Sequence, residues 1–261
     1  GETMACQLMR TTLVGSMAGL GQREAAVPIA LQAYEGVRDL IGDDHVYVAR
    51  LAGNAATLLR GVGEPMRALA LYDEAQAIEE RLLEPHDVTA AQTRSLRGSL
   101  LVELGRADEG EAELLAAVET YDVLLEQRQD PSLVVARAFS RSYLAPVLRA
   151  RGAYDESDAL LRASIDEKVT VVGGSLHPVL ELEYKELAAN AAARGDQRRL
   201  VARELDVADL FGAVRGPGST AFGNAVARAR RALDRAVAEG ASDPELEALM
   251  ARLEAAEAER R

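Results

Sequence analysis

Apolar and small residues recur along this chain at the three- and four-residue spacing of amphipathic helices. The helices come in pairs, and a glycine separates the two helices of each pair. These turn glycines lie between 42 and 47 residues apart, at Gly21, Gly63, Gly105, Gly152 and Gly195. A two-helix unit that returns at this period predicts a stacked helical array.

Mostly small side chains also occupy fixed positions relative to the turn glycines. Five residues after them stand Ala26, Ala68, Gly110, Ser157 and Leu200, and twelve after them stand Ala33, Ala75, Ala117, Ser164 and Val207. Seven residues before them stand Val14, Ala56, Gly98, Ala145 and Ala188. Small residues at these positions let two helices approach closely, because a bulky side chain would separate their backbones.

The pattern predicts five antiparallel helix pairs within residues 1–215, followed by a C-terminal helical cap at 216–261, which can also be read as a degenerate sixth repeat. The predicted pairs are 3–20 with 22–40, 46–61 with 65–83, 88–104 with 107–128, 132–151 with 154–172, and 178–194 with 197–212. Pro146 falls inside one predicted helix, where the missing N–H should kink it. Gly216-Pro217-Gly218 ends the array, and Ser219 or Thr220 can cap the next helix.

Three short stretches precede predicted first helices and contain all the histidines: Gly42-Asp43-Asp44-His45, Glu84-Pro85-His86-Asp87 and Gly174-Ser175-Leu176-His177-Pro178. Together with the period and the small positions, they give a sequence that resembles the tetratricopeptide repeat. It is most similar to the 42-residue variant of kinesin light chains and many bacterial proteins. The resemblance covers residues 5–212, and the repeat with Asp130-Pro131 in the histidine position departs from it. It implies an all-α, right-handed superhelical solenoid of antiparallel helix pairs.

In tetratricopeptide arrays, the inner face of each first helix lines a concave groove that binds peptides. The resemblance therefore implies contact residues at Arg50, Asn54, Thr57, Gln92, Ser95, Ser99, Phe139, Ser142, Tyr143, Lys185 and Glu186. Asn54 matches the family's groove asparagine, which grips a peptide backbone in relatives. An amide suits this role because it both donates and accepts hydrogen bonds. The alternative is that small polar residues are simply tolerated on a wet surface.

Composition narrows the possible partners. The chain is 48% hydrophobic and has no Trp, so Ala, Leu and Val must build its core. A net charge of −12 disfavours nucleic acid and anionic membranes as partners. No apolar run reaches the length of a membrane span.

The single cysteine fits a reducing cytoplasm. Because the chain begins with Gly1 rather than Met, close to an expected helix, we expect a fragment of a longer protein.

Other motifs suggest no catalysis, metal or cofactor. The histidines occupy equivalent positions in separate repeats, so we expect them to bond backbone groups at helix ends rather than to bind a metal. Cys6 is expected to be a small buried residue. Gly216-Pro217-Gly218 lacks the lysine of a phosphate-binding loop. The arginines of one later stretch, Arg228, Arg230, Arg231 and Arg235, form either a solvated face or a contact for an acidic partner.

Two functions remain open. The first is a non-catalytic scaffold that binds a peptide or a helix of another protein. The second is the sensor or regulatory region of a larger signalling protein, such as a bacterial Ser/Thr kinase. An enzyme in its own right is disfavoured, because no nucleophile or acid–base set converges in the sequence.

Overall fold

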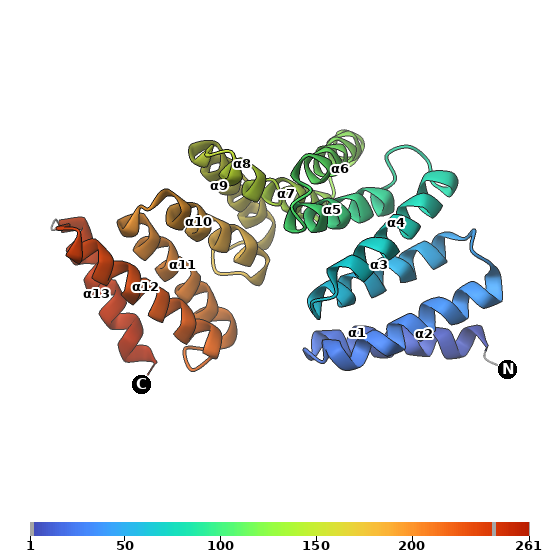
Figure 1. The fold of residues 1–261 in the computed structure, drawn as a ribbon, viewed down its shortest axis with the longest axis horizontal. Coiled ribbons are helices and arrows are strands. Elements are labelled where there is room, and N and C mark those ends of the chain that lie inside the picture. Colours follow the sequence, from blue (N-terminus) through green and yellow to red (C-terminus); the bar gives the residue numbers. More distant parts are fainter. Residues whose placement is uncertain (1–2, 242–243, 261) are drawn as a thin grey trace. The chain divides into compact units, whose positions relative to one another are not determined.

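The computed structural model describes residues 3–241 and 244–260, and the described residues form helices joined by short turns and loops (Figure 1). The helices are α1 (Met4–Gly19), α2 (Arg23–Ile41), α3 (Val46–Gly61), α4 (Pro65–Leu82), α5 (Val88–Glu103), α6 (Ala107–Gln127), α7 (Pro131–Ser142), α8 (Ala145–Ala150), α9 (Tyr154–Val172), η1 (Pro178–Leu180), α10 (Glu181–Arg194), α11 (Gln197–Arg215), α12 (Thr220–Ala238) and α13 (Pro244–Glu259).

The chain divides into two compact units, which we call unit 1 (residues 1–140) and unit 2 (residues 141–261). The division falls inside α7. In unit 1, α1 pairs with α2, α3 with α4, and α5 with α6, each pair packing against the next. In unit 2, α8 pairs with α9, α10 with α11, and α11 also packs against α12. The array of antiparallel helix pairs predicted from the sequence is thus confirmed.

The predicted turn glycines make the connection within each pair possible. Gly21, Gly63, Gly105, Gly152 and Gly195 all have positive φ angles, between 73° and 81°. Side chains with a Cβ atom rarely adopt this left-handed conformation, whereas glycine does so without steric cost. Each glycine therefore lets the chain reverse within two or three residues between one helix and the next.

The small residues lie where the paired helices touch, as predicted. Ala68 and Ala75 are fully buried between α3 and α4. The contact is especially close between α5 and α6, where a Cβ atom added to Gly110 would lie 2.6 Å from the carbonyl oxygen of Gly98. Two backbones can come this close only where neither residue carries a side chain.

Three local predictions need correction. The helix predicted for 132–151 is broken between Ser142 and Ala145, and Pro146 lies in the first turn of α8, where its missing N–H costs no hydrogen bond. The helix predicted from 178 begins as the short 3₁₀ segment η1. Cys6 is exposed rather than buried, because the buried face of α1 passes through Gln7 and Val14 instead.

The last two helices complete the core of unit 2. Val201, Leu205 and Phe211 of α11 share one buried cluster with Phe222 of α12 and Leu253 of α13. The hydroxyl Oγ of Ser219 accepts a hydrogen bond from the backbone N–H of Phe222 at 3.3 Å, so it caps α12 as predicted. Within the described part of the chain, no helix is both long enough and apolar enough to cross a membrane.

Candidate functional site: a groove in unit 1

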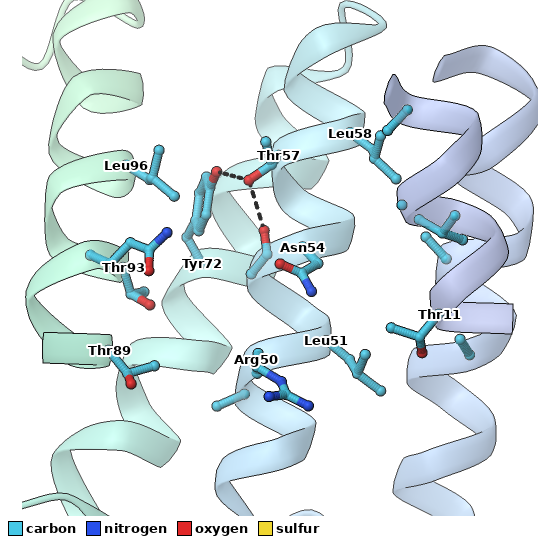
Figure 2. A pocket seen from close by; sticks show the side chains of 18 of the residues that line it. Thr11, Arg50, Leu51, Asn54, Thr57, Leu58, Tyr72, Thr89, Thr93 and Leu96 are labelled. Atoms are coloured by element: carbon cyan, nitrogen blue, oxygen red, sulfur yellow. Dashed lines mark hydrogen bonds between the residues drawn. The ribbon is translucent and has the colours of Figure 1, made fainter. Parts of the chain in front are cut away.

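The first helices of the three pairs in unit 1 line a groove of about 470 Å³. Figure 2 shows Thr11 of α1 on one side, Arg50 and Asn54 of α3 in the middle, and Thr93 of α5 on the other side. Side chains of α2 and α4 reach its floor, among them Tyr72. Apolar atoms, many of them from alanines and leucines, form most of its surface, and polar side chains such as Arg50, Asn54 and Gln92 lie among them. This combination of an apolar surface and a few polar groups is typical of a binding site.

Asn54 and Arg50 are two of the three polar residues of α3 that the sequence placed in the groove, and both are exposed there. The guanidinium of Arg50 lies over the Tyr47 ring, 4.5 Å from the ring centroid. Arg50 makes no ion pair with any described residue, so its N–H donors can reach a ligand. Gly53 leaves space beside Asn54, because a Cβ atom built on it would meet nothing within 4 Å. A ligand backbone can therefore approach α3 closely at this point.

Thr57 also lines the groove, but its hydroxyl is already engaged. It donates to the carbonyl oxygen of Gly53 at 3.0 Å, and its Oγ1 atom lies 2.9 Å from the hydroxyl of Tyr72 (Figure 2). Tyr72 is completely buried. The pair ties α3 to α4 below the groove, so Thr57 supports its floor as well as contributing to its surface.

Of the three predicted contacts on α5, one reaches the groove. Gln92 is exposed and lines it. Ser95 is buried and accepts a hydrogen bond from the Ser140 hydroxyl at 2.8 Å. Ser99 is buried as well, and its Oγ accepts from Arg60 Nη1 at 2.8 Å. These two serines join neighbouring helices rather than meet solvent, because Ser140 of α7 contacts Ser95 and Arg60 of α3 contacts Ser99.

The remaining predicted contacts lie outside this groove. Phe139, at the end of unit 1, is half-buried, and so is Tyr143 in unit 2. Ser142 is completely buried in unit 2 and donates to Glu183 Oε1 at 2.6 Å.

The two charged residues predicted on α10 are both ion-paired. Lys185 is exposed and pairs with Glu181 one turn earlier in the helix. Glu186 lies 2.6 Å from Arg149 Nη1. Both residues belong to unit 2.

Glu79 is a residue of the groove that the sequence analysis missed. It is 1% exposed, and its Oε1 atom accepts a hydrogen bond from the Thr93 hydroxyl at 2.9 Å. No described residue donates to its Oε2 atom. Burial raises the pKa of Glu79 to about 7, with a smaller rise from Asp87, while the Thr93 hydrogen bond acts in the opposite direction. Its helical spacing from Ala68, Tyr72 and Ala75 was the signal that would have placed it on the buried face of α4.

Two histidines have the helix-end role predicted for them. His45 Nδ1 accepts a hydrogen bond from the N–H of Tyr47 at 3.0 Å, and His177 Nδ1 accepts from the N–H of Val179 at 3.3 Å. Before α5, the cap is Asp87 instead, whose Oδ1 accepts from the N–H of Thr89 at 2.6 Å. His86 there adopts a φ of 63° and turns the chain.

Neither the protein-family models nor the curated proteins include a match to this sequence. Solved structures do match. A putative kinesin light chain from Podosopora anserina with nearly identical TPR-like repeats shares 19% identity at a TM-score of 0.60, covering 82% of this chain and 99% of that one. The fold is that of a tetratricopeptide-like repeat array. BtubC (BKLC) from P. vanneervenii is similar too, with 16% identity, a TM-score of 0.58, and coverage of 92% and 84%. The resemblance to kinesin light chain repeats is thus confirmed at the level of the fold.

Proposed function

We propose that this protein is a non-catalytic interaction scaffold, and that the groove of unit 1 holds an extended peptide or one face of a helix from a partner protein. The exposed pair Arg50 and Asn54, which lies among apolar side chains such as Leu51 and Leu58, is the observation that carries the proposal. Tetratricopeptide-like arrays generally mediate contacts between proteins, which supports the same function.

The chemistry of the groove suits a peptide backbone. The Asn54 amide can donate to a peptide carbonyl and accept from a peptide N–H at the same time. Arg50 can bond a carbonyl or a carboxylate. The open space at Gly53 lets a main chain come near enough for both contacts. Leu51, Leu58 and Leu96 line the groove beside these groups and can pack against an apolar anchor residue of the ligand.

The groove extends across three helices, from Thr11 of α1 past Asn54 of α3 to Thr93 of α5 (Figure 2), and solvent reaches it at the exposed Arg50 and Asn54. A long, solvent-accessible groove favours an extended ligand over a small metabolite, which usually needs most of its surface covered. The net charge of −12 makes nucleic acid and anionic membranes poor partners. We place the protein in the cytoplasm, as its single cysteine suggests.

A peptide-display selection tests the proposal. Random twelve-residue peptides are selected on the wild-type protein, and the dissociation constants of the best binders are compared with those for the double variant Asn54→Ala with Arg50→Ala. We expect at least a tenfold loss of affinity, about 1.4 kcal/mol. The melting temperature should barely change, because both side chains are exposed.

Arg128→Ala with Asn224→Ala is a matched control, since it removes the same two residue types at exposed positions outside the groove. This variant should bind the selected peptides as wild type does. If the groove variant keeps full affinity while changes on other surfaces abolish binding, the groove is not the site.

A further inference from the structure

Unit 2 contains a second cavity, of about 480 Å³, between α10, α11 and α12. Four cationic residues line it, Lys185 from α10 and Arg228, Arg231 and Arg235 from α12, and we call it the basic pocket. Between them its surface is made largely of alanines, such as Ala189, Ala192 and Ala232. Because alanine side chains are short, a ligand can lie close to the helix backbones, and the long lysine and arginine side chains of the pocket can reach it.

The sequence of α12 brings three of these cations to one face. Arg228, Arg231 and Arg235 are spaced by three and then four residues, which places them on the same side of a helix. Arg230 lies off this face and forms an ion pair with Glu257 of α13, with Arg230 Nη2 and Glu257 Oε2 2.6 Å apart. The arginine stretch therefore has two roles: Arg230 holds α12 to α13, and the other three face the cavity.

The charge of the basic pocket is only partly neutralised. Glu204 is the one carboxylate among its lining residues. It is 6% exposed, and its Oε1 atom accepts from Arg228 Nε at 2.7 Å. Lys185 is paired with Glu181. In contrast, Arg231 and Arg235 are exposed and make no ion pair or hydrogen bond with any residue that the structure describes.

Such unpaired cations are notable in a chain with 42 acidic and 30 basic residues. Most arginines in the described part of the chain have an acidic partner, whereas Arg231 and Arg235 lie one turn apart on one helix face and line the cavity. Two arginines one turn apart repel each other weakly, and a carboxylate placed between them would remove this repulsion. A guanidinium also matches a carboxylate in geometry, because it can donate two parallel hydrogen bonds.

We propose that the basic pocket binds an acidic segment of a partner protein, whose aspartate or glutamate side chains pair with Arg231 and Arg235. Charge complementarity selects this ligand. Glu204 holds the Arg228 guanidinium at the wall of the cavity. Arg228 is therefore part of the wall, and Arg231 and Arg235 pair with the carboxylates of the ligand. Nucleic acid is disfavoured, because its phosphates need a long basic surface and the chain as a whole is strongly acidic. The site shares no residue with the groove of unit 1.

The test uses a fluorescein-labelled hexaglutamate peptide as the probe, with hexaglutamine and hexathymidylate of the same length as alternatives. Fluorescence anisotropy on the full chain measures each dissociation constant at low salt and again at about 0.3 M salt, where a Debye length of a few ångströms screens exposed charges. We expect hexaglutamate to bind more tightly than hexaglutamine or hexathymidylate, and its dissociation constant to rise with the salt concentration. Arg231→Gln with Arg235→Gln should weaken it at least tenfold.

Two variants make the result specific. Arg23→Gln with Arg128→Gln changes the net charge equally at exposed arginines of unit 1, and it should leave hexaglutamate binding within twofold of wild type. Arg231→Lys with Arg235→Lys keeps the charge but loses the paired donors, and should bind with intermediate affinity. The proposal is overturned if hexaglutamate does not bind, if the control pair weakens it as much, or if hexathymidylate binds more tightly. The groove variant of unit 1 should bind hexaglutamate normally, so the two sites can fail separately.

Discussion

Lys168 Nζ lies 2.6 Å from Glu183 Oε1, and neither side chain has any exposed surface. The pair joins α9 to the first turn of α10 inside unit 2. Ser142 donates to the same carboxylate oxygen at 2.6 Å, and Lys168 also reaches the carbonyl oxygen of Val179. Burial lowers the pKa of Lys168, and the neighbouring Glu183 carboxylate opposes that shift.

Breaking this pair should be costly, whereas removing it entirely should not. We expect Lys168→Met to destabilise the protein by about 3–5 kcal/mol, because it leaves a buried carboxylate without its countercharge. The double variant Lys168→Met with Glu183→Leu should recover most of that loss, since both charges are then absent. Urea unfolding of Lys168→Met, Glu183→Leu and the double variant measures the coupling free energy between the two side chains. A double variant that is as unstable as the sum of its single variants would contradict this account.

Glu79 should make stability depend on pH in a defined window. Its pKa is raised from 4.5 to about 7 in the folded state, so between these values the folded protein holds a proton that the unfolded chain has released. The contribution of Glu79 to stability is therefore complete below pH 4.5 and is lost as pH rises through about 7. Relative to wild type, Glu79→Gln should be more stable at pH 8 than at pH 5, with the difference on the order of 1–3 kcal/mol.

Urea unfolding at both pH values checks this prediction. Glu84→Gln is the control, because Glu84 is exposed on the loop after α4 and has no side-chain partner among the described residues. The free energy of unfolding of Glu84→Gln relative to wild type should be the same at pH 5 and pH 8. An equal pH response in both variants would show that burial of Glu79 is not the cause.

Two glycine substitutions should have opposite effects. Gly110→Ala should destabilise the protein by about 1–3 kcal/mol, because the new methyl group would lie 2.6 Å from the Gly98 carbonyl oxygen and from Val102 Cγ2. Gly53→Ala adds the same group to a helix where no atom lies within 4 Å. It should stabilise the fold by about 0.5–1 kcal/mol. Thermal unfolding of the two variants compares them, and similar shifts in the same direction would refute the packing argument.

Removing the last two helices should damage unit 2. Truncation after Arg215 uncovers Val201, Leu205 and Phe211, which now share a buried cluster with α12 and α13. We expect the shortened chain to lose solubility and to show faster hydrogen exchange in α11. A truncated protein that stays monomeric, soluble and equally stable would mean that residues 216–261 are a separate tail rather than a cap.

The sequence alone predicted the repeating architecture, because each part of it depends on local rules. A glycine is needed wherever the chain takes a positive φ, and Gly63 and Gly105 could be recognised without any structure. The small residues Ala68 and Gly110 occupy equivalent positions of two repeats and mark close helix contacts in both. Asn54 and Arg50 could be assigned to the inner face by counting from the turn glycine.

Only the tertiary structure decided which inner-face residues reach solvent. Thr57 and Ser99 both stand six residues before their turn glycines, yet Ser99 is buried and accepts a hydrogen bond from Arg60 of a neighbouring helix, whereas Thr57 is exposed. In the same way, counting cannot show that Glu79 keeps an unpartnered oxygen beneath the groove, or that Arg231 and Arg235 remain unpaired while Arg230 finds Glu257. Burial and ion pairing depend on which side chains arrive from other helices, and local sequence rules do not contain that information.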